Sequence, residues 1–168
     1  MLFRIMAGIM FSVAGSVAGI SFSERLKAEL ELCHNIREML LTSAVIIRCR
    51  ADDVYTISAE LKQDKSLEKL TFLQEIPEKY TPDRNFREIW KNAVNSQKNL
   101  PEDAKRILHD FGATLGQSDI EGQLVAMDAL NENAVILEKK YSEIYTQKGK
   151  LYRSIGILLG LMTGILII

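Results

Sequence analysis

The side chains best suited to catalysis or metal binding are few and lie far apart in this sequence. The chain has two histidines and two cysteines, and among these only Cys33 and His34 are neighbours. Adjacent residues on a helix point about 100° apart, so these two cannot easily hold one metal ion. Motifs for phosphate, dinucleotide, zinc or redox chemistry are absent from the sequence. We therefore predict no catalytic residue, no metal and no cofactor, and interpret the protein as non-enzymatic.

A more specific pattern covers residues 111–123. The run Phe-Gly-Ala-Thr-Leu-Gly-Gln-Ser-Asp ends at Asp119 and is followed by Gln123. Gly112 lets a neighbouring helix approach or the chain bend, and Gly116 supplies a left-handed helix end. Asp119 complements the dipole of the next helix, and Gln123 lies one turn later on the same face. Two interpretations stay open: a structural corner, or a partner-binding site made by these four residues with Asp119 and Gln123 as its polar groups.

The 111–123 pattern is expected to lie between helices. Apolar residues recur with a 3.6-residue period along the middle of the chain, and strand-like alternation is absent. We predict an all-α protein whose residues 23–153 form a compact bundle of about six helices. Residues 81–83, Thr-Pro-Asp, predict one helix start, and Pro101 predicts the next. Ser118 and Glu121 have the spacing of a capping box, which would open a long final helix.

Charge is segregated along the chain. The sequence is 47% hydrophobic and 26% charged, yet Ile5–Phe22 and Ser154–Ile168 contain no charged residue. A membrane span needs about 20 apolar residues. We therefore predict transmembrane anchors at residues 1–22 and 154–168, continuous with the first and last helices of the bundle. The net charge of −1 gives no field that would attract nucleic acid, so nucleic acid is not an expected partner. The two apolar segments make membrane lipid an expected partner.

Both predicted anchors carry glycines at four-residue spacing, which allows close packing of helices in a bilayer. These are Gly15 and Gly19 near the N-terminus, and Gly156, Gly160 and Gly164 near the C-terminus. The faces that they form can pair within one chain or between chains of a homo-oligomer.

Basic residues flank both apolar segments on the side of the bundle, at Arg25, Lys27, Lys148, Lys150 and Arg153. The positive-inside rule then places the bundle in the cytosol. In the alternative interpretation, residues 16–18 form the cleavage site of a signal peptide. The chain would then be an extracytosolic helical binding or receptor domain.

The 111–123 pattern also carries a resemblance. It is preceded by Phe86-Arg87-Glu88-Ile89-Trp90 and followed by Lys150-Leu151-Tyr152-Arg153 and a glycine-rich tail. Together these segments resemble the stage III sporulation protein AB family, in which F-G-x-x-L-G-x-x-D-x-x-x-Q precedes a long helix and a C-terminal anchor.

The resemblance implies a subunit of the eight-protein stage III A complex, in the mother-cell membrane that faces the forespore. The family is also similar to the cytosolic helical domains of the type II secretion platform protein, which are six-helix bundles next to an ATPase. By this analogy the protein would be a scaffold that couples the ATPase, stage III sporulation protein AA, to the other stage III A membrane proteins.

Overall fold

Every regular element of the described chain is helical. The computed structural model describes residues 2–50, 52–80 and 85–167, and within these ranges the side chains of residues 2–9, 11, 12, 160, 161 and 163–167 lie outside the description. The described residues contain no strand. This confirms the prediction of an all-α fold for this part of the chain.

The chain divides into two compact units. Unit 1 comprises Met1–Leu30 and Lys140–Ile168, and unit 2 comprises Glu31–Lys139. Helices α1 (Leu2–Arg50) and α5 (Ile120–Ile144) contribute residues to both units. The predicted boundaries after residues 22 and 153 concern membrane insertion, and they stay a prediction.

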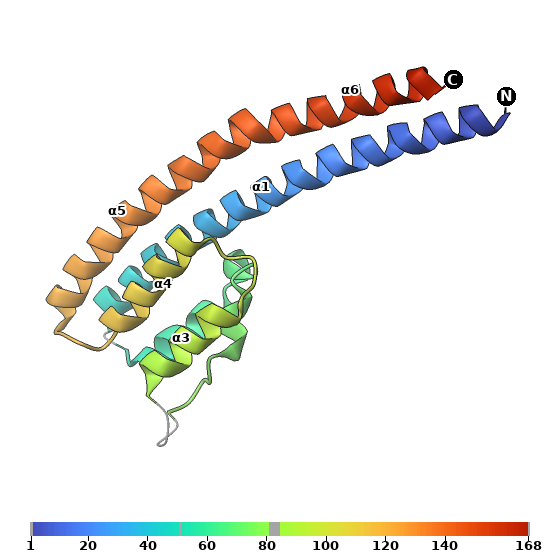
Figure 1. The fold of residues 1–168 in the computed structure, drawn as a ribbon. Coiled ribbons are helices and arrows are strands. Elements are labelled where there is room, and N and C mark those ends of the chain that lie inside the picture. The colour runs from blue at the N-terminus through green and yellow to red at the C-terminus, as the bar shows by residue number, and fades with distance from the viewer. Residues whose placement is uncertain (1, 51, 81–84, 168) are drawn as a thin grey trace. The chain divides into compact units, whose positions relative to one another are not determined.

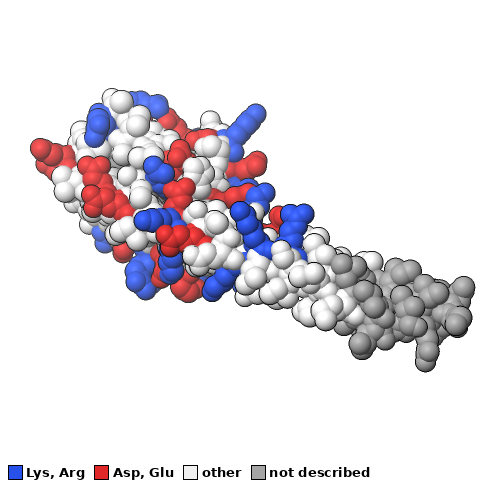
Figure 2. Space-filling view, turned by 90° about the horizontal axis from the view of Figure 1, so that it is seen from above, with Lys and Arg blue, Asp and Glu red and all other residues white. Residues whose placement is uncertain are grey.

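Unit 2 is a helical bundle (Figure 1). Besides its parts of α1 and α5, it contains α2 (Val54–Gln63), the 3-10 turns η1 (Lys65–Leu67) and η2 (Thr71–Glu75), α3 (Phe86–Ser96) and α4 (Glu102–Thr114). Helices α3 and α4 lie side by side. On the face in Figure 2, acidic and basic side chains are intermixed over this bundle, as expected for a water-exposed surface.

Aspartate and asparagine side chains begin two of these helices. The Asp53 carboxylate accepts hydrogen bonds from the backbone N–H groups of Tyr55 and Thr56 at the start of α2. Its bond from the Thr56 hydroxyl also lowers the pKa of Asp53. Helix α3 begins at Phe86, and the Asn85 side chain accepts from the Arg87 N–H at 3.0 Å. The predicted cap at Thr81 is therefore wrong for this helix, because Asn85 satisfies its first turn; residues 81–83 themselves lie outside the described residues.

An aromatic cluster forms the centre of unit 2. Trp90 of α3 is 1% exposed. Its ring centroid lies 5.3 Å from that of Phe72, 5.9 Å from that of Phe86 and 5.1 Å from that of Phe111. The indole N–H of Trp90 donates to the backbone oxygen of Leu108 at 2.7 Å. The cluster thus joins η2, α3 and α4 while its one buried donor keeps a partner.

In unit 2, α5 buries one stripe of side chains at the three- and four-residue spacing of an amphipathic helix. The stripe consists of Met127, Leu130, Ala134 and Leu137. Ile136, the residue before Leu137, lies outside this stripe and is 66% exposed. Ile120 is 43% exposed, because it is the first residue of the helix and lies beside an exposed loop.

Unit 1 pairs the N-terminal part of α1 with the C-terminal helices of the chain (Figure 1). The segment predicted as the uninterrupted end of the long helix contains a π-helical turn, η3 (Tyr145–Gly149), before α6 (Lys150–Ile167). Within the part of the chain that the structure describes, no helix carries an apolar stretch long enough to cross a bilayer. The predicted anchors at residues 1–22 and 154–168 fall partly on side chains outside that description, and they stay a prediction.

Candidate functional site

The connection between α4 and α5 is a corner closed by side-chain hydrogen bonds. Gly116 adopts φ +71°, the left-handed conformation expected of it. Its backbone N–H donates to Gln123 Oε1 at 3.0 Å, and Gln123 Nε2 donates to the backbone oxygen of Ser118 at 3.0 Å. One side-chain amide therefore bridges two backbone groups of the loop and holds it against the first turn of α5.

Asp119, and not Ser118, caps α5. Asp119 Oδ1 accepts from the Gly122 N–H at 3.0 Å, and the helix begins at Ile120. The predicted capping box from Ser118 to Glu121 is therefore wrong by one residue. The physical reason is competition: Gln123 fixes the carbonyl of Ser118 in the loop, and the carboxylate of Asp119 is then the acceptor in reach of the third N–H.

Gly112 lies beneath the indole ring of Trp90. A Cβ at this position would lie 2.2 Å from Trp90 Cδ1 and 2.6 Å from Cγ. Of the two roles weighed for Gly112, the structure shows close approach of a neighbouring helix, α3. The guanidinium of Arg87, also on α3, donates to the backbone oxygen of Ala113 at 2.7 Å and reinforces the same contact.

The corner interpretation accounts for all four residues of the sequence pattern. Gly112 permits packing and Gly116 the turn, while Asp119 and Gln123 satisfy backbone donors and an acceptor. Asp119 is exposed and Gln123 is half-buried, so the corner also lies at the surface. A role of these residues in partner binding stays a prediction.

The glycines of unit 1 bring two helices into backbone contact. A Cβ at Gly156 would lie 2.8 Å from the backbone oxygen of Gly15 and 2.8 Å from Gly19 Cα. A Cβ at Gly19 would lie 2.7 Å from the backbone oxygen of Tyr152. Three of the five candidate packing glycines thus meet within one chain, and the positions of Gly160 and Gly164 in α6 lie outside the residues whose surroundings are described.

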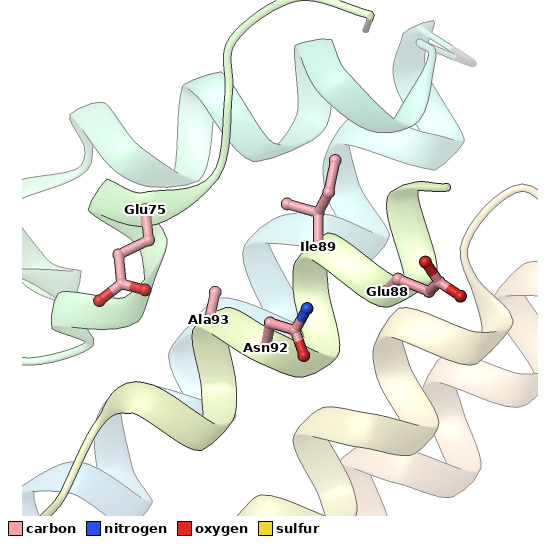
Figure 3. Close-up of a pocket in the computed structure, with 5 residues that line it drawn as sticks. All are labelled: Glu75, Glu88, Ile89, Asn92 and Ala93. Atoms are coloured by element: carbon pink, nitrogen blue, oxygen red, sulfur yellow. The ribbon is translucent and has the colours of Figure 1, made fainter. Parts of the chain in front are cut away.

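An open groove of about 440 Å³ lies on unit 2 where α3 passes η2. Its lining consists of Glu75, Glu88, Ile89, Asn92 and Ala93 (Figure 3). Glu75 accepts a hydrogen bond from the Ser96 hydroxyl at 2.7 Å, which fixes one carboxylate at the surface. This lining offers two carboxylates and an amide, which can form hydrogen bonds to a bound partner.

Sequence reasoning missed an ion-pair cluster between α1 and α5 in unit 2. Glu138 accepts from His34 Nδ1 at 2.9 Å and from Arg37 at 3.1 Å. The partners are more than 100 residues apart in sequence, so no local spacing could have indicated them. Among the described residues, no group of three or more histidine, cysteine or acidic side chains has the geometry of a metal site.

His109 should make the stability of the bundle depend on pH. Its Nε2 lies 3.2 Å from Asn95 Oδ1, and its buried Nδ1 has no hydrogen-bond partner among the described residues. Burial, and then the charge of Lys91, lower the pKa of His109 from its ordinary 6.5. As pH falls below 6.5, the unfolded chain therefore binds a proton that the folded chain resists, and the free energy of unfolding decreases.

We expect His109→Gln to remove this part of the pH dependence. The measurement is the urea midpoint at pH 7.5 and 5.5, compared between wild type and His109→Gln. Glu138 affects the free energy of unfolding in a lower pH range than His109. Burial raises its pKa, but hydrogen bonds from His34 and Arg37 outweigh this and lower it below 4.5, so its contribution is lost only as pH falls through the folded pKa. Equal midpoint shifts in wild type and His109→Gln would contradict the assignment to His109.

Comparison with known proteins supplies the family. Neither the curated proteins nor the solved structures contain a match to the chain. A family model described as stage III sporulation protein AB matches residues 4–168. The match includes the α4–α5 corner and both glycine-bearing helices of unit 1. The chain therefore belongs to the stage III sporulation protein AB family.

Proposed function

We propose that this protein is a non-enzymatic scaffold of the stage III A sporulation complex, held in the mother-cell membrane by both ends of its chain. Its helical bundle would lie in the cytosol and couple the ATPase, stage III sporulation protein AA, to the other membrane subunits. Family membership supports a role in stage III of sporulation.

The observation that carries this proposal is the glycine crossing in unit 1. Gly19 and Gly156 bring two backbones so close that a methyl group on either would overlap the other helix. Such crossings are typical of membrane helices, which associate through close packing because lipid provides no hydrophobic drive. A paired anchor of this kind would hold a cytosolic bundle at the membrane through two helices instead of one.

The surface of unit 2 supports a role in binding. Its charged residues are of both signs, and the open groove beside α3 and the exposed α4–α5 corner offer polar groups on ordered helices. A polar surface with charges of both signs suits a soluble protein partner whose binding can be reversed. We therefore propose that stage III sporulation protein AA binds this surface.

Affinity capture from sporulating cells tests the proposal. With the full chain as bait in mild detergent, we expect to recover stage III sporulation protein AA and other stage III A proteins. A folded, membrane-extracted bait that recovers none of them would overturn the scaffold role.

A double variant, Asp119→Ala with Gln123→Ala, assigns the role of the corner in the same experiment. Loss of the cap and of the amide bridge should lower the free energy of unfolding by about 1–2 kcal/mol. Helicity should be unchanged at the temperature of capture. Lost capture by the folded variant would place the partner at the corner, and retained capture would leave these residues a structural role. Gln117→Ala with Glu121→Ala is the matched control on the same loop and helix turn.

A further inference from the structure

Unit 1 carries a group of exposed basic side chains on its C-terminal helices. Lys148 lies in η3, and Lys150 and Arg153 lie in the first turn of α6. All three are exposed, and none forms an ion pair within the described part of the chain. Residues 145–154 contain these three basic residues and no acidic one, so this stretch has a charge of +3.

Helix pairing brings a further basic residue to the same level. A Cβ at Gly149 would lie 3.4 Å from Ser23 Oγ, so Ser23 of α1 packs against η3. Arg25 follows within one turn of α1, and its side chain is 76% exposed although it pairs with Glu29 at 3.3 Å. Basic side chains therefore extend from both helices of the pair at one position along it.

An aromatic pair lies at the same level, because Tyr152 directly precedes Arg153 and Phe22 directly precedes Ser23. Phe22 and Tyr152 are 58% and 42% exposed, and their ring centroids are 5.8 Å apart. The chain carries no charge from Phe22 back to Ile5 or, after Arg153, from Ser154 to Ile168. In Figure 2, basic side chains stand at the border of the uncharged stretch of unit 1. Basic and aromatic residues at the border of an uncharged stretch are typical of a helix that crosses the headgroup region of a bilayer.

We propose that Lys148, Lys150 and Arg153, together with Arg25, form a basic collar that binds the phosphate headgroups of anionic lipids. The inference rests on the proposed membrane anchoring and deepens it by naming the lipid class. Each basic side chain near an anionic membrane surface raises the binding constant for that surface about fivefold at low ionic strength, and salt weakens this attraction. Tyr152 and Phe22 fix the depth at which the collar meets the headgroups.

The test uses the full chain reconstituted in vesicles of equimolar phosphatidylcholine and phosphatidylglycerol. The bilayer around the protein is excised with a solubilising polymer, and its two lipids are counted by mass spectrometry. We expect phosphatidylglycerol to be enriched about threefold or more around the wild type at low salt. The enrichment should fall towards one for the variant Lys148→Gln, Lys150→Gln, Arg153→Gln.

A matched triple variant on unit 2, Arg48→Gln with Lys98→Gln and Arg106→Gln, removes the same charge elsewhere and should keep the enrichment. Inserted wild type without enrichment, or equal loss in both triple variants, would overturn the collar. If inorganic phosphate removed the enrichment while chloride of equal ionic strength did not, the site would take free phosphate, and lipid binding would be overturned. Wild type that fails to insert into any vesicle would instead overturn the proposed anchoring, so the two failures are distinguishable.

Discussion

Gly112→Ala is expected to lower the free energy of unfolding of the bundle by about 2 kcal/mol or more. In a helix this change normally stabilises, because alanine loses less backbone entropy than glycine. Here the added methyl would lie 2.2 Å from the indole of Trp90, which is itself held by Phe72, Phe86 and Phe111. Overpacking of a closed core costs about 1–3 kcal/mol and also removes the usual gain. The readout is urea unfolding followed by Trp90, the single tryptophan of the chain.

Gly122→Ala is the matched control in α5. Its Cβ would lie 2.8 Å from Ser118 Oγ and 2.9 Å from Asp119 Oδ1, which are the ends of two exposed side chains, so at most the cap made by Asp119 has to readjust. We expect this variant to unfold within about 1 kcal/mol of the wild type. A stabilised Gly112→Ala protein would show that α3 and α4 do not pack as closely as the contact with Trp90 requires.

The second large effect is expected at the glycine crossing of unit 1. Gly156→Leu should separate the two helices, since even the Cβ would lie 2.8 Å from backbone atoms of Gly15 and Gly19, which cannot rotate away. A strain of more than about 1.4 kcal/mol shifts the paired population at least tenfold. A disulfide between Ser23→Cys and Gly149→Cys reports pairing, because Ser23 Oγ lies 3.4 Å from the position of a Cβ at residue 149.

The disulfide assay uses full-length protein in detergent with Cys33 and Cys49 replaced by serine. We expect cross-linking in the parent and loss of it with Gly156→Leu. Ser154→Leu places the same side chain at an exposed position two residues away and should cross-link like the parent. Unchanged cross-linking with Gly156→Leu would mean that the crossing does not hold the two helices together.

Helical character and the positions of turns could be predicted from the sequence because they depend on neighbouring residues. Gly116 is an example, since a left-handed helix end is a local preference of glycine. The choice between close approach and bending at Gly112 could not be made in this way. It depends on Trp90, which belongs to another helix and is 22 residues away in sequence.

The errors at the helix starts have a common cause. Ser118 and Asp119 are both good caps, and the hydrogen bond of Gln123 to the Ser118 carbonyl decides between them. Asn85 likewise caps α3 where Thr81 was expected. The hydrogen bonds of His34 and Arg37 with Glu138 join residues more than 100 positions apart in sequence, so they can be identified only when the fold is known. Sequence patterns thus indicate which residue types suit a helix end or a contact, and tertiary packing selects one of them.

The π-helical turn η3 has a consequence for how insertions in this protein can be accommodated. The buried residues of α5 follow a heptad through Met127 and Ala134, which would continue to residues 141, 148 and 155. The residues packed in unit 1 are Gly149 and Gly156, one position later. A straight α-helix drifts by about 20° per heptad, which accounts for this offset. The π turn of η3 adds one residue to the helix between the two sets of contacts. In evolutionary terms, η3 has the form of a one-residue insertion in a long helix, and removal of one residue within 145–148 would convert it into ordinary α-helix.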